Sequence, residues 1–266
     1  MFSPSTMIKD LDQLREKKPL VTNITNYVVT NSTANALLAI GASPIMTHAV
    51  EEVEDLMNIS SSLVINLGTV ARTYLEAMPA AWAAANKRGV PVVLDPVGAG
   101  ASRVRTEAPA SMLSKYQPAI VRGNASEIMT LAGESGEAKG VDSTMGADAA
   151  ELAAKALAGV HKCTVVVSGE VDVVTDGERV VRVAGGSDMM PQVTGLGCTA
   201  SALCGAFAAV SGSFLEAAVH AMAAMNVAGE IAAEQAKGPG SLQLHFYDAL
   251  YSMGRDDIEK RMRIEG

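Results

Sequence analysis

The chain has 266 residues, which is enough for one large α/β domain or two small ones with a sizeable core. Hydrophobic residues make up 48% of the chain and charged residues 19%, a balance that excludes a disordered protein. The formal net charge is −8, and an acidic surface repels phosphate backbones, so we expect no nucleic-acid partner. A nucleotide ligand remains compatible, because backbone amides and a metal ion hold phosphates inside acidic proteins.

The cysteines and the apolar runs bear on where the protein works. Cys163, Cys198 and Cys204 are odd in number and form no CxxC motif, which argues against a disulfide framework or a zinc site. The N-terminal segment is charged, and the longest apolar run, which begins near Cys198, is interrupted by Glu216 and His220. We therefore expect a cytoplasmic protein that does not associate with a membrane.

Along the chain, short Val- and Ile-rich runs that end in glycine, aspartate or another polar residue predict buried strands. They span residues 62–68, 90–95, 119–123 and 164–169. Ala-rich segments with helical spacing lie between them, at 74–87 and 147–157. The alternation predicts βαβ units, and hence an α/β fold with a mostly parallel central sheet and helices on both faces.

The second half of the chain departs from this alternation. Residues 171–183 form two alternating runs joined by Asp176 and Gly177, which predicts an antiparallel hairpin. Three helical segments follow, at 198–210, 214–233 and 241–253. The polar segment 134–145 is predicted to be a surface loop. No linker or repeat divides the sequence, so we expect a single domain over residues 1–266.

The strongest local signal is the segment VTGLGCTASALCGAF at 193–207. Gly195 and Gly197 let the backbone approach a ligand, and the helix that follows aims N–H groups at an anion such as a transferring phosphoryl group. A glycine turn before a buried helix explains the segment about equally well. A dinucleotide-binding motif is set aside, because the glycines do not follow a buried strand. At the helix start, the thiol of Cys198 is expected to have a lowered pKa.

Two acidic residues follow predicted strands. Asp95 ends the strand in VVLDPVGAGAS, at the edge where open α/β sheets bind ligands, and its carboxylate would suit Mg²⁺. Glu127, in RGNASEI, comes three residues after Asn124, so a helix capping box explains it without any ligand. A turn before Pro96 would likewise explain Asp95. Their expected location favours a functional site, because both acidic residues are predicted to lie at one sheet edge beside the 195–198 loop.

The N-terminal segment 19–56 is rich in Asn and Thr at a strand-to-helix transition, and Met46 follows its next apolar run. Polar amides beside a methionine suit a small heteroaromatic ring, although a capped helix with a core methionine is the alternative. His48 lies near this predicted pocket and is a weaker candidate for substrate contact. The sequence contains no HExxH, G-x-S-x-G or GxxxxGK[ST] motif that would favour a zinc protease, a hydrolase or a P-loop protein.

Four motifs, taken in this order, resemble the hydroxyethylthiazole kinase family, within the ribokinase-like superfamily. They are ITNYVVTNSTANALLAIGASPIM, DPVGAGAS, RGNASEI and GLGCTASAL. The resemblance runs from about Pro19 to the last helices. It implies a homotrimeric cytoplasmic enzyme, with sites at subunit interfaces, that uses Mg-ATP to phosphorylate the hydroxyl of 4-methyl-5-(2-hydroxyethyl)thiazole in thiamine salvage. Such an enzyme is a phosphotransferase with an alcohol group as acceptor.

The resemblance also implies site residues. Met46 and the backbone at Gly195 match positions that contact the thiazole, and Asn26 matches an active-site asparagine. The ATP-contacting positions correspond to Arg122 and Ser168, beside the phosphate loop that contains Gly197. Asp95 and Glu127 match the acidic positions associated with Mg²⁺.

Two positions differ from related enzymes. Many relatives carry a histidine where this chain has Thr22. Cys198 occupies the place of the aspartate base of the sugar kinases, although the thiazole kinases themselves carry cysteine there. Because phosphoryl transfer passes through a loose transition state, we expect Cys198 to be a weak base or an orienting group rather than a covalent nucleophile.

Alternative functions are also compatible with the sequence. A related vitamin kinase would act on hydroxymethylpyrimidine or pyridoxal, although the 19–56 segment favours thiazole. A catalytically inactive sensor that binds the nucleotide or the thiazole is a different class. The acidic pair and the glycine loop are both intact, which argues against the sensor.

Overall fold

The computed structural model describes residues 2–133 and 143–266. Among these residues, nine strands form one sheet in the order β2-β1-β3-β4-β5-β6-β7-β8-β9. The strands are β1 Leu20–Ile24, β2 Ser43–Met46, β3 Ser62–Asn66, β4 Val92–Asp95, β5 Ile120–Asn124, β6 Thr164–Ser168, β7 Val171–Thr175, β8 Val180–Ala184 and β9 Arg263–Glu265. The four buried strands predicted from sequence are β3, β4, β5 and β6.

The sheet is parallel from β2 to β6 and antiparallel from β6 to β9. The change comes at the predicted hairpin, which forms β7 and β8. Asp176 shapes the turn, because its Oδ1 accepts hydrogen bonds from the backbone N–H groups of Glu178 and Arg179. Gly177 adopts a φ of +98°, a conformation that favours glycine.

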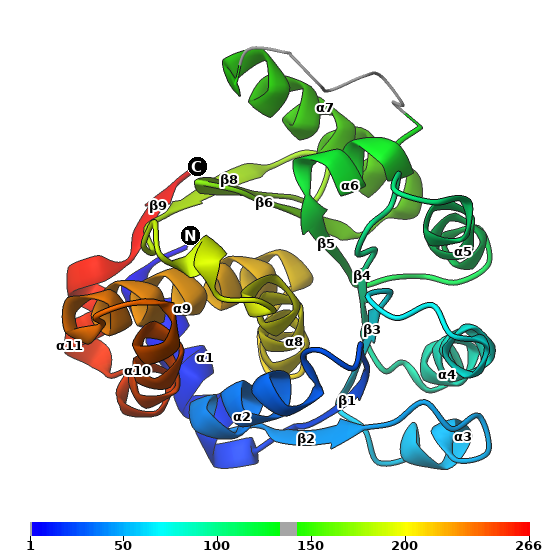
Figure 1. The fold of residues 1–266 in the computed structure, drawn as a ribbon, viewed down its shortest axis with the longest axis horizontal. Helices are drawn as coiled ribbons and strands as arrows, with labels where there is room; N and C mark the ends of the chain where they lie inside the picture. The colour runs from blue at the N-terminus through cyan, green and yellow to red at the C-terminus, as the bar shows by residue number, and fades with distance from the viewer. Residues whose placement is uncertain (1, 134–142) are drawn as a thin grey trace.

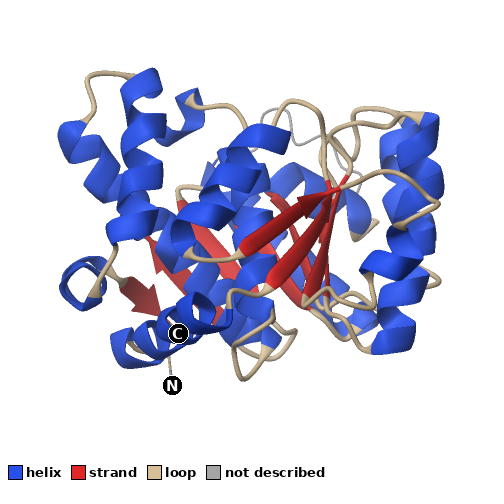
Figure 2. Cartoon of the chain, turned by 90° about the horizontal axis from the view of Figure 1, so that it is seen from below, coloured by secondary structure: helices blue, strands red, loops and turns tan. Residues whose placement is uncertain are grey.

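Helices cover both faces of the sheet, which confirms the predicted three-layer α/β fold (Figures 1 and 2). One layer contains α3 Val53–Leu56, α4 Arg72–Arg88, α5 Arg103–Leu113, α6 Ala125–Leu131 and α7 Ser143–His161. The other contains α1 Pro4–Lys17, α2 Thr30–Ile40, α8 Leu196–Ala208, α9 Phe214–Gln235, α10 Pro239–Ser252 and α11 Arg255–Arg261. Of the predicted loop at 134–145, residues 134–142 lie outside the described residues, and α7 begins at Ser143.

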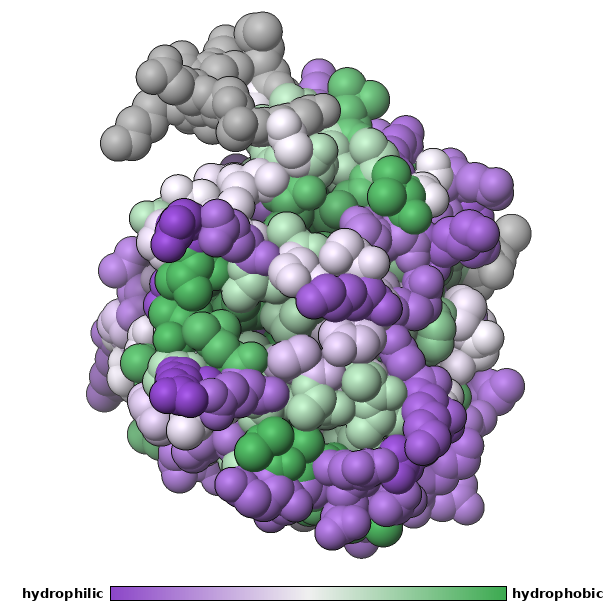
Figure 3. All heavy atoms as spheres, turned by 90° about the vertical axis from the view of Figure 1, so that its right-hand side faces the viewer, coloured by the Kyte–Doolittle hydropathy of each residue, from purple (hydrophilic) through white to green (hydrophobic). Residues whose placement is uncertain are grey.

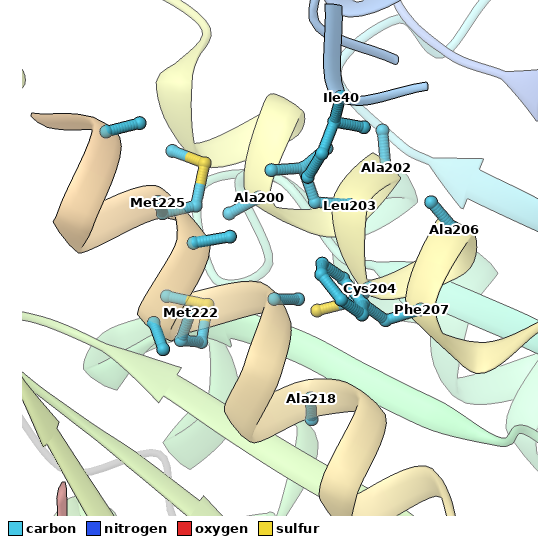
Figure 4. Close-up of a cluster of buried hydrophobic side chains, with 14 of the residues drawn as sticks. Ile40, Ala200, Ala202, Leu203, Cys204, Ala206, Phe207, Ala218, Met222 and Met225 are labelled. Atoms are coloured by element: carbon cyan, nitrogen blue, oxygen red, sulfur yellow. The ribbon is translucent and has the colours of Figure 1, made fainter. Parts of the chain in front are cut away.

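Helix α8 lies at the centre of one layer and determines where the glycine loop sits. It packs against β1, β3, β4 and β5, and against α9 (Figure 4). A Cβ at Gly205 would come within 2.7 Å of Val64, so this glycine lets the helix lie close to the sheet. Leu203, Phe207 and Met222 belong to the buried cluster that packs around these two helices, with Leu203 beside Ile40 of α2. The start of α8 is thereby held at the carboxyl ends of the parallel strands.

The outer surface over α4 and α5 has hydrophilic residues around its margin and hydrophobic residues that gather in one larger area, at the left of the view, and in smaller ones (Figure 3). Arg72 pairs with Glu76 along α4, and Arg103 pairs with Glu107 along α5. Such exposed pairs contribute little to stability but keep the face solvated. Within residues 2–133 and 143–266, no helix is long and apolar enough to cross a membrane.

Candidate active site

Asp95 is the centre of a buried polar network at the carboxyl ends of the strands. It ends β4, its side chain is fully buried, and its register partner on β3 is Asn66. Asn66 Nδ2 and Ser201 Oγ each donate a hydrogen bond of 2.7 Å to Asp95 Oδ2. Nη1 of Arg122 lies 3.8 Å from the same oxygen. The other oxygen, Oδ1, is buried and has no hydrogen-bond partner among the described residues.

The environment of Asp95 shifts its pKa. Burial raises the pKa of Asp95 to about 6, against the opposing effects of Arg122, Ser201 and Asn66, and the nearby charge of Glu127 adds to the rise. The side chain therefore carries a charge at neutral pH although it is buried. A buried carboxylate oxygen without a donor, next to a second acid, suits a hard cation.

Glu127 forms the predicted capping box at the start of α6. Asn124 accepts the backbone N–H of Glu127, and Glu127 Oε2 accepts the N–H of Asn124, both at 2.9 Å. Glu127 Oε1 also accepts the N–H of Gly98, at 2.8 Å, in the turn after β4. The predicted capping box is thus confirmed. The side chain of Glu127 also joins the turn of the DPVGAGAS motif to the start of α6.

A cavity of about 800 Å³ lies beside this network. Arg122, Ser168, Gly195 and Gly197 line it, so four of the predicted site residues meet in one place. Arg122 Nη2 donates a hydrogen bond to Ser168 Oγ. Helix α9 contributes Met222 and Met225 to the lining, and both are labelled in Figure 4. A cavity lined by the start of a helix, a guanidinium and apolar side chains suits a nucleotide.

Cys198 and Asn26 lie together next to Asn66. Asn26 Nδ2 donates to Asn66 Oδ1 at 2.8 Å and lies 3.5 Å from Cys198 Sγ. Burial and the charge of Asp95 raise the pKa of the Cys198 thiol to about 11. The expected lowering of this pKa is therefore wrong, because desolvation and a neighbouring carboxylate outweigh the helix N-terminus. Cys198 is a protonated thiol at neutral pH.

Met46 lies apart from the cavity. It ends β2, the edge strand, where it pairs with Asn23 of β1. His48 follows and stacks on Tyr74, with ring centroids 4.6 Å apart, and the exposed Tyr27 packs edge-on against Tyr74. Met46 is thus near an aromatic cluster at the edge of the sheet. Thr22 is buried and hydrogen-bonded to Ser60, outside the lining of the cavity.

Several polar residues of this region were not among the predicted site residues, and Asn66 and Asp172 are two of them. Asn66 is the last residue of the buried run SLVIN and ends its strand as Asp95 ends the next one, so the same positional signal could have found it. Asp172 is buried at the cavity wall, where it accepts the Gly169 N–H and the Asn226 amide, both at 3.2 Å. Burial raises the pKa of Asp172 to about 6. Because Asp172 lies in an alternating hairpin strand, its sequence position did not indicate that it is buried at the cavity.

Comparisons with known proteins bear on this arrangement. The hydroxyethylthiazole kinase family model matches residues 11–256. The chain belongs to the hydroxyethylthiazole kinase family. It is 56% identical over 256 residues to the hydroxyethylthiazole kinase of Nitratidesulfovibrio vulgaris strain Miyazaki F, and covers 96% of both chains. It is 52% identical to that of Syntrophus aciditrophicus, covering 99% of this chain and 98% of the relative.

Solved structures agree with this family assignment. The structure of hydroxyethylthiazole kinase from Pyrococcus horikoshii OT3 matches with a TM-score of 0.91 at 41% identity, over 98% of both chains. A ribokinase-like superfamily protein from Enterococcus faecalis matches with a TM-score of 0.65 at 11% identity, covering 90% of this chain and 87% of that one. The second likeness concerns the fold alone. Together they confirm the predicted ribokinase-like fold and the family that the four motifs resemble.

Proposed function

We propose that the chain transfers the terminal phosphoryl group of Mg-ATP to the hydroxyl of 4-methyl-5-(2-hydroxyethyl)thiazole, as one domain in the cytoplasm. Kinase activity on hydroxyethylthiazole, in thiamine biosynthesis, follows from the family. The nucleotide, the metal ion and the role of each residue form the proposal. One observation carries it: Arg122 lines the cavity with Ser168 and Gly197, and also lies 3.8 Å from the buried Asp95.

The lining of the cavity supports binding of the nucleotide phosphates at Arg122, Ser168 and Gly197. A guanidinium offers paired donors to phosphate oxygens, and the start of α8 adds backbone N–H groups and a positive dipole end. Gly195 has a φ of +87°, and a Cβ there would come within 2.4 Å of Val29, so only glycine fits this turn. The turn would bring backbone amides to the phosphoryl group and the substrate.

Asp95 and Glu127 fit a Mg²⁺ ion. Asp95 Oδ1 has no hydrogen-bond donor among the described residues, whereas Oδ2 is held by Asn66 and Ser201. Both oxygens of Glu127 accept backbone N–H groups, so Glu127 would act through a metal-bound water and a remaining lone pair. Bound Mg²⁺ would neutralise charge between the phosphate oxygens.

Asn26, Cys198, Met46 and Gly195 form the substrate side of the proposal. The Asn26 amide lies between Asn66 and the Cys198 thiol, where it would orient a hydroxyl group. Since Cys198 is a thiol at neutral pH, it would accept or donate a hydrogen bond and would not remove a proton before transfer. Met46 would contact the heteroaromatic ring from the edge strand.

An ADP-release assay tests the function. We expect turnover that requires both the thiazole alcohol and Mg²⁺. Asp95→Ala and Glu127→Ala should shift the Mg²⁺ titration, and Arg122→Ala should raise the KM for ATP more than that for thiazole. Faster turnover with hydroxymethylpyrimidine or pyridoxal would contradict the substrate. Nucleotide binding without turnover would instead support a sensor.

Exposed hydrophobic side chains support a homotrimer with active sites at subunit interfaces. Tyr27, Val28 and Leu38 lie at or near α2, and Leu244 and Tyr251 lie on α10, which packs against α2; all five are more than half exposed. Clustered exposed apolar residues favour a protein interface. Light scattering after gel filtration should give a trimer for the wild type and smaller species for Val28→Asp. Val104→Asp, on α5, is the matched control, and a monomeric wild type would contradict the proposal.

A further inference from the structure

Arg105 joins the two turns that hold the acidic pair. It lies in the first turn of α5, and its guanidinium donates to three backbone carbonyl groups. Nη1 donates to Val97 at 3.0 Å and to Leu67, and Nη2 donates to Gly68 at 3.1 Å. Leu67 and Gly68 follow β3, whereas Val97 follows β4, so one side chain bridges two separate loops.

Each of these turns also holds one part of the acidic site. After β3, the Gly68 N–H donates to Asn66 Oδ1 at 2.9 Å, which orients the Asn66 amide so that Nδ2 reaches Asp95. After β4, the Gly98 N–H donates to Glu127 Oε1 at 2.8 Å. Arg105 therefore acts on Asp95 through the first turn and on Glu127 through the second.

The second turn is built around the Arg105 side chain. Gly98 has a φ of +78°, and a Cβ there would come within 2.9 Å of Arg105 Cδ. Thr106, the next residue of α5, accepts the N–H of Gly100 at 2.9 Å. The start of α5 thus holds this turn with two neighbouring side chains. Only the planar guanidinium, with its five N–H donors, reaches all three carbonyl groups at once.

We propose that Arg105 is a positioning residue that, through these two turns, orients Asp95 and Glu127 for a divalent cation, which rests on the metal roles proposed above. Residues that orient metal ligands from behind change metal affinity by about 10- to 100-fold when they are replaced. Arg105 itself touches neither the cation nor the substrate.

The test measures Mn²⁺ binding by electron paramagnetic resonance in the presence of ADP, together with Mg²⁺ titrations of turnover. Arg105→Lys keeps the charge but cannot bridge both turns, so the Mn²⁺ dissociation constant should rise about tenfold or more. At saturating metal, the KM for ATP should change by less than about threefold, because the phosphate contacts at Arg122 are intact. Arg103→Ala, on the same helix with a side chain 88% exposed, should leave metal binding unchanged.

Three further variants, Ile258→Val, Asp95→Ala and Glu127→Ala, separate positioning from stability and from the proposed function. Ile258→Val, on the buried face of α11, lowers stability by about 1 kcal/mol without touching the site, and should leave Mn²⁺ binding unchanged. If Arg105→Lys lowers the Tm but leaves Mn²⁺ binding and the Mg²⁺ titration unchanged, Arg105 is only a structural brace and the inference is overturned. If Asp95→Ala and Glu127→Ala also leave Mn²⁺ binding unchanged, the metal roles themselves fail, and this inference fails with them.

Discussion

Gly197 lies against the guanidinium of Arg122, so closely that a Cβ at residue 197 would come within 2.8 Å of Nη1. Arg122 in turn donates to Ser168 and lies beside Asp95. Gly197 therefore has two effects. It lets a ligand approach the start of α8, and it leaves room for the guanidinium of Arg122 in the cavity. This contact leads to the first prediction.

Gly197→Ala is expected to displace the Arg122 guanidinium from Ser168 and so weaken nucleotide binding. A hydrogen bond to a charged group contributes about 1.5–3 kcal/mol, so the KM for ATP should rise about 10- to 100-fold. Steady-state kinetics with ATP and thiazole varied separately measure this effect. Gly240→Ala, where a Cβ would meet no atom within 4 Å, is the matched control. An unchanged KM for ATP would show that Arg122 does not hold the phosphates.

Asn66→Ala is expected to lower turnover about 10- to 100-fold, because Asp95 Oδ2 and the Asn26 amide each lose a buried hydrogen bond. The KM for ATP should change less, since Asn66 is not part of the cavity lining. Asn86→Ala, which also removes side-chain hydrogen bonds but lies at the far end of α4, should leave turnover near that of the wild type. Equal losses in the two variants would indicate a purely structural role for Asn66.

Cys198 is expected to behave as a thiol across the neutral pH range. Because its pKa is raised to about 11, alkylation by iodoacetamide at pH 7.5 should be slow and should accelerate steadily as the pH rises towards 10. Cys198→Ser should keep turnover within about tenfold of the wild type, since an alignment role needs only a small hydrogen-bonding group. Rapid alkylation at pH 7, or a phosphorylated Cys198 detected by mass spectrometry, would contradict this assignment.

Asp10 and His220 form a buried pair outside the lining of the cavity, and we expect it to make stability depend on pH. His220 Nδ1 lies 2.8 Å from Asp10 Oδ2, and Ser211 Oγ also bonds to this oxygen. Burial tends to raise the pKa of Asp10, but the hydrogen bonds from His220 and Ser211 outweigh it and hold the pKa below its ordinary value. A lowered carboxylate pKa contributes stability above about pH 4 that is lost as the pH falls through the folded-state pKa.

Asp10→Asn should therefore lower the Tm at pH 7, by an amount that shrinks as the pH falls below about 4. The free energy of unfolding at pH 7 should fall by about 1–3 kcal/mol, the usual cost of disturbing a buried hydrogen-bonded charge. Asp12→Asn, exposed on the same helix, is the control and should have little effect. A Tm difference for Asp10→Asn that stays constant from pH 7 to pH 3 would rule out the linkage to Asp10.

The residue pattern alone predicts the layers of this protein. Val-rich runs such as 164–169 are hydrophobic on both faces, so they fit only a sheet covered by helices on both sides, and Asp176-Gly177 marks where the sheet turns antiparallel. Strand ends are also visible in the sequence. Because the carboxyl ends of parallel strands meet at one edge, the pattern also predicts that Asp95 and Glu127 lie near the glycine loop, whereas the family resemblance implied Arg122 and Ser168.

Tertiary structure decided what the sequence left open, since burial and cross-strand partners are properties of the folded chain. Cys198 stands at a helix start, which favours a thiolate, yet its burial, together with the charge of Asp95, raises the pKa and keeps the thiol protonated. Arg105 is an ordinary helical arginine in the sequence, and only the folded chain brings the carbonyl groups of two loops, about 30 residues apart along the chain, within reach of one side chain. Local patterns determine which elements form, whereas the partners of each polar atom depend on contacts between segments that are distant in sequence.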